Sequence, residues 1–180
     1  MNKTLLSTAV VLAALALTLQ AAPAKSVHKI AGGAYQKAAV QGCMNQWLFN
    51  GVWRLRVTGV DPITDGSWSG YGVNVQLRNG THGTVELGNT GVGGRGQNVQ
   101  LLTSDGNAMT LNDLAYQQLG YRDVVQGGSL NGQFKYHFPA GADTNVKPQK
   151  FILQIDPHDS TKAHYSMPDP SFRVNLVCSK

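Results

Sequence analysis

The chain has 180 residues, of which 42% are hydrophobic and 14% are charged, and its formal net charge is +5. This length suits one ordinary domain with a substantial core. The basic residues are scattered along the chain, whereas nucleic-acid-binding domains gather them on one face or stripe. We therefore expect no nucleic-acid partner.

Residues 1–24 have the pattern of a cleaved signal peptide. Lys3 gives a positive start, residues 5–19 are apolar, and residues 22–24 match the small-x-small cleavage pattern. The apolar run of about 15 residues is shorter than the roughly 20 residues that cross a bilayer, which argues against the alternative of an uncleaved anchor. We expect export to the periplasm or the exterior, with no stable membrane insertion after cleavage.

The two cysteines, Cys43 and Cys178, are predicted to form one disulfide, because oxidising compartments favour it in exported proteins. The lack of a CxxC spacing argues against a metal site. Cys178 is in phase with Val174 and Leu176, and Cys43 is in phase with Trp47. The phases predict that both thiols point inward and meet in or near the core.

The mature chain divides into a poorly ordered lead-in over residues 25–42 and a single domain over residues 43–180. Within the domain, alternation with a period of two predicts strands separated by turn signals. Those strands are expected at residues 53–58, 71–78, 82–87, 98–103, 108–111, 130–138, 151–156 and 172–178.

One short helix is predicted near residues 111–119, because Thr110 and Asp113 resemble a helix start and Gly120 a stop. Residues 61–70 and 156–170 read as loops, and the glycine-rich residues 88–96 as a mobile connection. The whole pattern favours an all-β, antiparallel sandwich or barrel in which each strand buries one face.

Four strand and turn patterns resemble those of a known group of proteins. They are the W-x-L-x-V strand that begins at Trp53, the V-x-V-x-L-x-N strand that ends at Asn79-Gly80, L-x-x-x-D-G at residues 101–106, and F-x-Y-x-F-P at residues 134–139. Over residues 52–156 the chain resembles secreted bacterial immunoglobulin-like β-sandwich proteins of the mycobacterial secreted-antigen type. The resemblance implies an immunoglobulin-like sandwich of about seven to nine strands and export. The function of that group is largely unknown, and it supplies no catalytic residues.

One polar loop holds several groups that bind metals in other proteins. Asp156, His158, Asp159 and His164 offer nitrogen and carboxylate ligands for zinc or copper. The alternative is a solvated loop rich in turn formers. No G-x-S-x-G motif or other recognisable catalytic constellation is present, so we expect no enzyme, no catalytic residue and no cofactor.

Aromatic and basic residues suggest a binding role instead. Trp68 lies in a glycine- and serine-rich stretch, where it would stack on a sugar if exposed or cap the core if buried. Arg54, Arg56 and Arg78 occupy outward strand positions, where they would bind an acidic partner or a polysaccharide, or form an ordinary solvated face.

The sequence thus predicts an exported, non-enzymatic binding protein of the cell envelope or exterior, with a protein or a polysaccharide as partner. A carbohydrate-binding module that uses Trp68 is the first alternative. A small metal-binding or hydrolytic periplasmic protein is the second. The expected position of a working site is in the loops at residues 61–70, 88–96 or 156–170, and the oligomeric state stays open.

Overall fold

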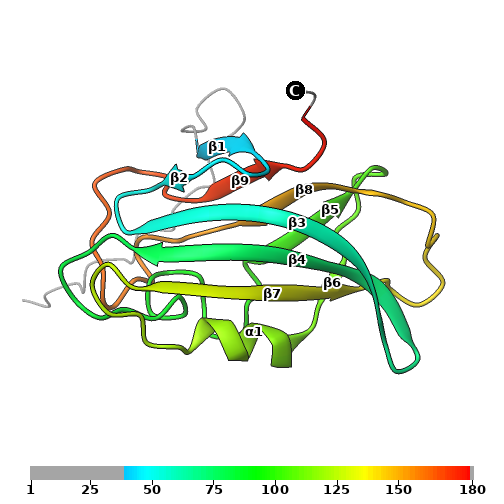
Figure 1. The fold of residues 1–180 in the computed structure, drawn as a ribbon, viewed down its shortest axis with the longest axis horizontal. Helices are drawn as coiled ribbons and strands as arrows, with labels where there is room; N and C mark the ends of the chain where they lie inside the picture. Colours follow the sequence, from blue (N-terminus) through cyan, green and yellow to red (C-terminus); the bar gives the residue numbers. More distant parts are fainter. Residues whose placement is uncertain (1–38, 179–180) are drawn as a thin grey trace, which may run out of the picture. The chain divides into compact units, whose positions relative to one another are not determined.

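The computed structural model describes residues 39–178, which form nine strands and one helix in two facing sheets (Figure 1). The four-stranded sheet has the order β1-β9-β8-β5, and the five-stranded sheet has the order β2-β3-β4-β7-β6. The elements are β1 (Val40–Cys43), β2 (Leu48–Phe49), β3 (Trp53–Asp65), β4 (Trp68–Asn79), β5 (Val99–Thr103), β6 (Thr110–Leu111), α1 (Asp113–Gly120), β7 (Ser129–His137), β8 (Pro148–Leu153) and β9 (Phe172–Asn175).

The predicted all-β sandwich with one short helix is therefore confirmed. The signal peptide over residues 1–24 and most of the lead-in lie outside the described residues. Strand β1 includes residues 40–42, which the sequence pattern assigned to the lead-in. Across residues 39–178, no helix is long and apolar enough to cross a bilayer.

The core lies between the two sheets, on the inward positions of the alternating strands. Trp53, Leu55 and Val57 are completely buried, as their phase predicts. Phe134 of β7 stacks on Phe151 of β8, with ring centroids 5.9 Å apart, so aromatic side chains from both sheets meet in the middle. This contact joins the five-stranded sheet to the four-stranded sheet.

Helix α1 packs against β7 and extends the core. Its first turn is capped by Asn112, whose side-chain oxygen accepts a hydrogen bond from the backbone N–H of Ala115 at 3.0 Å. Leu119 lies over Gly132 of β7, where an added Cβ would come within 2.2 Å of the leucine side chain. The helix therefore needs a glycine beneath it to sit this close to the sheet.

The longest elements, β3 and β4, form one hairpin that includes most of the predicted loop at residues 61–70. That loop prediction is wrong, because the strands continue to a turn at Gly66 and Ser67. Proline is tolerated at position 62 because β2 pairs only with Arg54 and Leu55, which leaves the rest of that β3 edge without a partner strand. Asp61 and Pro62 are thus residues of the edge strand β3, whereas Gly66 lies in the turn and Gly70 in β4.

Two further sequence predictions are corrected in the glycine-rich region. Part of the segment 88–96 packs into the core, because residues 90–92 and 96 are buried, whereas Gly94 and Arg95 are exposed. Thr90 is fully buried, accepts a hydrogen bond from the indole Nε1 of Trp53 at 2.8 Å, and accepts another at its carbonyl from Tyr165. The strand expected at residues 82–87 is reduced to a single bridge between Val85 and Val124. Residues 88–96 are therefore a structural segment.

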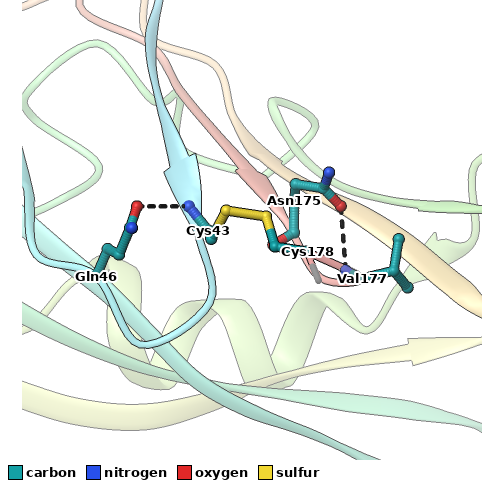
Figure 2. The surroundings of a disulfide bond; sticks show 5 residues. All are labelled: Cys43, Gln46, Asn175, Val177 and Cys178. Atoms are coloured by element: carbon teal, nitrogen blue, oxygen red, sulfur yellow. Dashed lines mark hydrogen bonds between the residues drawn. A yellow bond between two sulfur atoms is a disulfide. The ribbon is translucent and has the colours of Figure 1, made fainter. Parts of the chain in front are cut away.

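Cys43 and Cys178 form the predicted disulfide, with a Cα–Cα distance of 5.9 Å and a separation of 135 residues (Figure 2). Their predicted inward orientation is wrong. Strand β9 ends at Asn175, before Cys178, and β1 pairs with β9 in parallel, so that Cys43 lies beside Asn175. Gly42 faces Leu48 on the inner side, so Cys43 faces outward by the alternation of the strand. The bond ties the last residues to an edge of the four-stranded sheet.

Candidate binding surface

The outward face of the five-stranded sheet carries the three predicted arginines together with two aromatic side chains. Arg54 and Arg56 come from β3, Arg78 from β4, Phe49 from β2, and Trp47 from the segment before β2. We call these five residues the arginine–aromatic surface. Arg54 and Arg78 are exposed, and Arg56 is half-buried.

The register of β3 and β4 brings like charges together on this surface. Arg54 lies directly opposite Arg78, and Arg56 lies opposite Gln76. Like charges at directly opposite positions of an antiparallel pair are destabilising. Some other interaction must therefore hold the guanidinium groups in place.

The aromatic rings supply that interaction. The guanidinium carbon of Arg54 lies 4.6 Å from the ring centroid of Phe49. The guanidinium carbons of Arg56 and Arg78 lie 4.7 and 4.6 Å from the ring of Trp47. Each such cation–π contact contributes about 0.5–1 kcal/mol at an exposed site. A guanidinium that lies over a ring keeps its N–H donors for a further partner.

Hydrogen bonding distinguishes the three arginines. Arg56 donates from Nε and Nη2 to the side-chain oxygen of Gln76, at 3.0 and 2.5 Å, which fixes its orientation. Within residues 39–178, Arg54 and Arg78 make no side-chain hydrogen bond, and none of the three arginines forms an ion pair. The surface therefore presents positive charge that the described part of the chain does not neutralise.

Trp47 is the residue of this surface that the sequence pattern missed. Its phase with Cys43 predicted an inward ring, but the chain turns at Asn45, which has a positive φ of 69° and whose N–H donates to the carbonyl of Val57 at 2.8 Å. Leu48 is the buried residue of β2, so its neighbour Trp47 lies on the outward face, over two arginines. Cys43 and Trp47 thus both face outward, on different sheets. The sequence does contain one signal for such a contact. Arg54 and Arg56 alternate on the outward face of β3, where a nearby aromatic ring can lie over a guanidinium group.

Trp68 lies at the other end of the same face, in the first position of β4 after the hairpin turn. Its side chain is 53% exposed, so it does not cap the core. The indole stacks on the imidazole of His137, with centroids 5.8 Å apart and an interplanar angle of 20°. Trp68 is thus an exposed ring that stacks on one neighbouring side chain.

A row of amides joins the two ends of the face. Gln133 donates to the side-chain oxygen of Asn74 at 3.0 Å, and Asn74 donates to the carboxylate of Asp61 at 2.6 Å. Gly72 lies beside them, and an added Cβ there would come within 2.3 Å of the Gln133 amide. The absence of a side chain at position 72 lets Gln133 lie low on the sheet. We call Asn74, Gln76, Asn131 and Gln133 the amide row.

The predicted metal ligands lie elsewhere and are not brought together. Asp156, His158, Asp159 and His164 are all exposed. Asp156 is engaged with its own turn, because its side chain accepts a hydrogen bond from the backbone N–H of His158 at 2.9 Å. No group of three or more histidine, cysteine or acidic side chains in residues 39–178 is arranged to hold a metal ion.

The loop at residues 156–170 instead borders a hollow of about 490 Å³ on the outward face of the four-stranded sheet. Lys150 and Arg173 line the hollow with Asp156 and Asp169. Arg173 forms an ion pair with Asp169 at 3.8 Å. Cations and carboxylates are therefore mixed on this face.

The shifted pKa values belong to other parts of the molecule. Burial raises the pKa of Tyr136 well above its ordinary value, and burial likewise raises the pKa of Tyr116 and of Tyr165. Hydrogen bonds from Thr103 and then Asn107 lower the pKa of Asp105 in an exposed turn. The tyrosines are neutral core residues, and the aspartate organises its turn.

Comparison with known proteins finds similarity in structure rather than in sequence. No family model matches the chain, and no curated protein matches it. The YjhA protein of Bacillus subtilis matches with a TM-score of 0.51 and 12% identity, over 75% of this chain and 99% of that protein. The secreted protein MPT63 of Mycobacterium tuberculosis matches with a TM-score of 0.48 and 13% identity, over 78% and 99% of the two chains. An uncharacterised β-sandwich protein of Clostridium difficile matches with a TM-score of 0.46 and 6% identity, over 82% and 100%.

A secreted mycobacterial protein is among the matching structures. The two-sheet architecture confirms the predicted sandwich. At 12% identity, the match to YjhA concerns the fold alone. The chain is similar in fold to the YjhA protein of Bacillus subtilis.

Proposed function

We propose that this chain is an exported, non-enzymatic binding protein whose contact surface is the arginine–aromatic surface. The signal-type pattern of residues 1–24 supports export, as does the Cys43–Cys178 bond, because such bonds persist in oxidising compartments. The side chains of the surface bind and orient a partner, and none of them is a nucleophile.

The observation that carries this proposal is the unneutralised arginine pair. Arg54 and Arg78 lie opposite each other, at a cost in stability, and no carboxylate of the described residues pairs with either. An anionic partner would remove that repulsion. Arginine is well suited to it, because the planar guanidinium binds carboxylate and phosphate through two parallel hydrogen bonds.

The aromatic rings strengthen the argument. The rings of Phe49 and Trp47 hold the guanidinium groups before any partner arrives. A partner therefore loses less side-chain entropy on binding than it would with free arginines. Aromatic and arginine side chains are also the residues that dominate binding energy at interfaces.

The test compares two double variants with the same change in charge. R54E/R78E reverses the candidate surface, and K150E/R173E reverses two cations of the four-stranded sheet. Binding to an immobilised polyuronate, a sulfated polysaccharide and poly-glutamate is measured by biolayer interferometry, and circular dichroism checks the fold.

We expect R54E/R78E to weaken binding about 100-fold. Two charge-assisted contacts are lost, and the two new glutamates repel the anionic ligand. The control variant K150E/R173E should weaken binding by less than about 3-fold, because charges far from the ligand change only the long-range attraction between protein and polyanion. Equal losses in both variants, or no binding of wild type to any of the three polyanions, would contradict the proposal.

A further inference from the structure

We propose that the partner is an acidic polysaccharide chain that runs along β4, with its charged groups on Arg54 and Arg78 and a sugar ring on Trp68. This inference rests on the proposed function and adds the class of ligand.

The outward face is continuous from one end of β4 to the other. Arg78 is the second-last residue of the 12-residue strand and Trp68 is the first. At a rise of about 3.4 Å per residue, the two side chains are separated by roughly 30–35 Å along the strand. A site of this length fits a polymer and is too long for a single sugar or a small anion.

The middle of the face is suited to hydroxyl groups. The amide row offers donors and acceptors, and Gly70 and Gly72 of β4 project no side chain above the sheet. Gln133 and Asn74 hold each other through a hydrogen bond of 3.0 Å. Side-chain amides fixed in this way recognise neutral polar groups at low entropic cost.

The charges along the face set the direction of the ligand. The carboxylate of Asp61 lies on the β3 flank of the middle region and accepts a hydrogen bond from Asn74, and Lys135 lies on the β7 flank of the same cross-strand row. The middle of the face therefore has one charge of each sign, whereas the arginine end has cations alone, so an anionic group is favoured more strongly at the arginine end. The charged groups of the polysaccharide therefore belong at the arginine end, and its neutral ring belongs at Trp68.

Trp68 provides the platform for that ring. The indole is 53% exposed, and its contact with His137 limits its motion. An exposed indole that is already oriented offers a large apolar surface at small entropic cost. Phe49, which is 43% exposed, adds a second apolar edge at the arginine end.

The main chain favours a polysaccharide over an acidic peptide. Peptides that bind sheets usually gain affinity from backbone hydrogen bonds at an open edge. An open edge of this sheet is at β3, beyond its pairing with β2. Strand β4, along which the ligand runs, is paired on both sides, with β3 and with β7, so its backbone groups are used inside the sheet. A ligand on this face meets side chains only, which suits sugar hydroxyls and carboxylates.

The experiment measures affinity by calorimetry for three probes: a polyuronate oligomer long enough to span β4, the matching disaccharide, and poly-glutamate of the same charge. The variants are W68A, D61N and R54E/R78E. Quenching of tryptophan fluorescence gives a second readout, because Trp47 and Trp68 lie on the proposed path while Trp53 is fully buried, and W68A removes the contribution of Trp68.

We expect W68A to weaken binding of the long oligomer about 10-fold and to leave the disaccharide unaffected, as the loss of one aromatic contact would. D61N should strengthen binding of the long oligomer about 2-fold by removing one like charge. Poly-glutamate should bind at least about 10-fold more weakly than the oligomer and be insensitive to W68A.

Two outcomes separate this inference from the proposed function. If poly-glutamate binds as tightly as the oligomer and W68A changes neither, the polysaccharide is overturned while the binding surface stands, provided that R54E/R78E abolishes both. If wild type binds none of the three probes, both proposals fall.

Discussion

The two outward sheet faces of this molecule both carry cations, but they surround them differently. On the five-stranded sheet, Arg54 and Arg78 lie opposite each other over aromatic rings, and neither pairs with a carboxylate of the described residues. On the four-stranded sheet, Arg173 is paired with Asp169, and Lys150 shares its hollow with Asp156. The number of cations on a face is therefore less informative than what the cations touch.

The difference has an energetic meaning. In an ion pair between partly exposed groups, each charge is balanced by its partner, and the pair contributes between about 0 and 1 kcal/mol to the stability of the fold. Two arginines that face each other gain nothing from their own charge, and the rings only fix their position. The five-stranded face is arranged to meet an external anion, whereas the four-stranded face is largely neutralised by its own residues.

The largest expected effect is on the stability of the fold and comes from the disulfide at the edge of the four-stranded sheet. Removing the bond with C43S/C178S should lower the free energy of unfolding by roughly 3–5 kcal/mol, because the closed loop is long. Urea unfolding measures it. Affinity for the polyuronate should stay within about 2-fold, since Trp47 is held independently by the Asn45–Val57 hydrogen bond.

A matching loss of affinity in that variant would show that the disulfide positions Trp47. The two faces would then be coupled through the segment between β1 and β2. The measurement therefore has to be made at a temperature where the variant is folded, with circular dichroism as the check.

A smaller effect concerns the rings that hold the arginines. Trp47→Ala removes two cation–π contacts, and Phe49→Ala removes one, while neither changes the net charge. We expect affinity for the polyuronate to fall about 10-fold in the first variant and about 3-fold in the second. If calorimetry shows no change in affinity for either substitution, the arginines bind through their charge alone. The rings then do not explain the difference between the two faces.

The smallest effect comes from releasing a cation on the four-stranded face. Asp169→Asn frees Arg173 from its partner, and because the pair is partly exposed we expect stability to change by less than about 1 kcal/mol. Polyuronate binding should rise by no more than about 2-fold. A stricter test combines this substitution with R54E/R78E in one triple variant.

There the expected result is continued weak binding, because an unpaired cation without aromatic support does not make a prepared site. If the triple variant bound the polyuronate with wild-type affinity, an arginine without a carboxylate partner would be sufficient for binding. The aromatic half of the comparison would then be wrong.

Much of the scaffold followed from local pattern. Alternation placed Trp53, Leu55 and Val57 inside and the arginines of β3 outside, and the count of two cysteines indicated their pairing. The short helix followed from its start and stop signals. These features depend on a few neighbouring residues or on composition, which is why they could be predicted.

Other features depend on which segments meet. Residues 61–70 resemble a loop by composition, but pairing with β4 and an open edge at Pro62 make them strand. Cys43 faces outward because β1 joins the edge of β9 in parallel, which no local phase reveals. Residues 88–96 look mobile, yet the indole of Trp53 holds part of this segment in the core through Thr90.

The sequence by itself therefore determined the two-sided character of each strand and the disulfide partners. Only the tertiary structure decided that Arg54 lies opposite Arg78, and that Trp47 turns back over Arg56 and Arg78. The physical reason is that side-chain alternation is a property of one strand, whereas register and reversal are set by hydrogen bonds between distant residues, such as Asn45 to Val57.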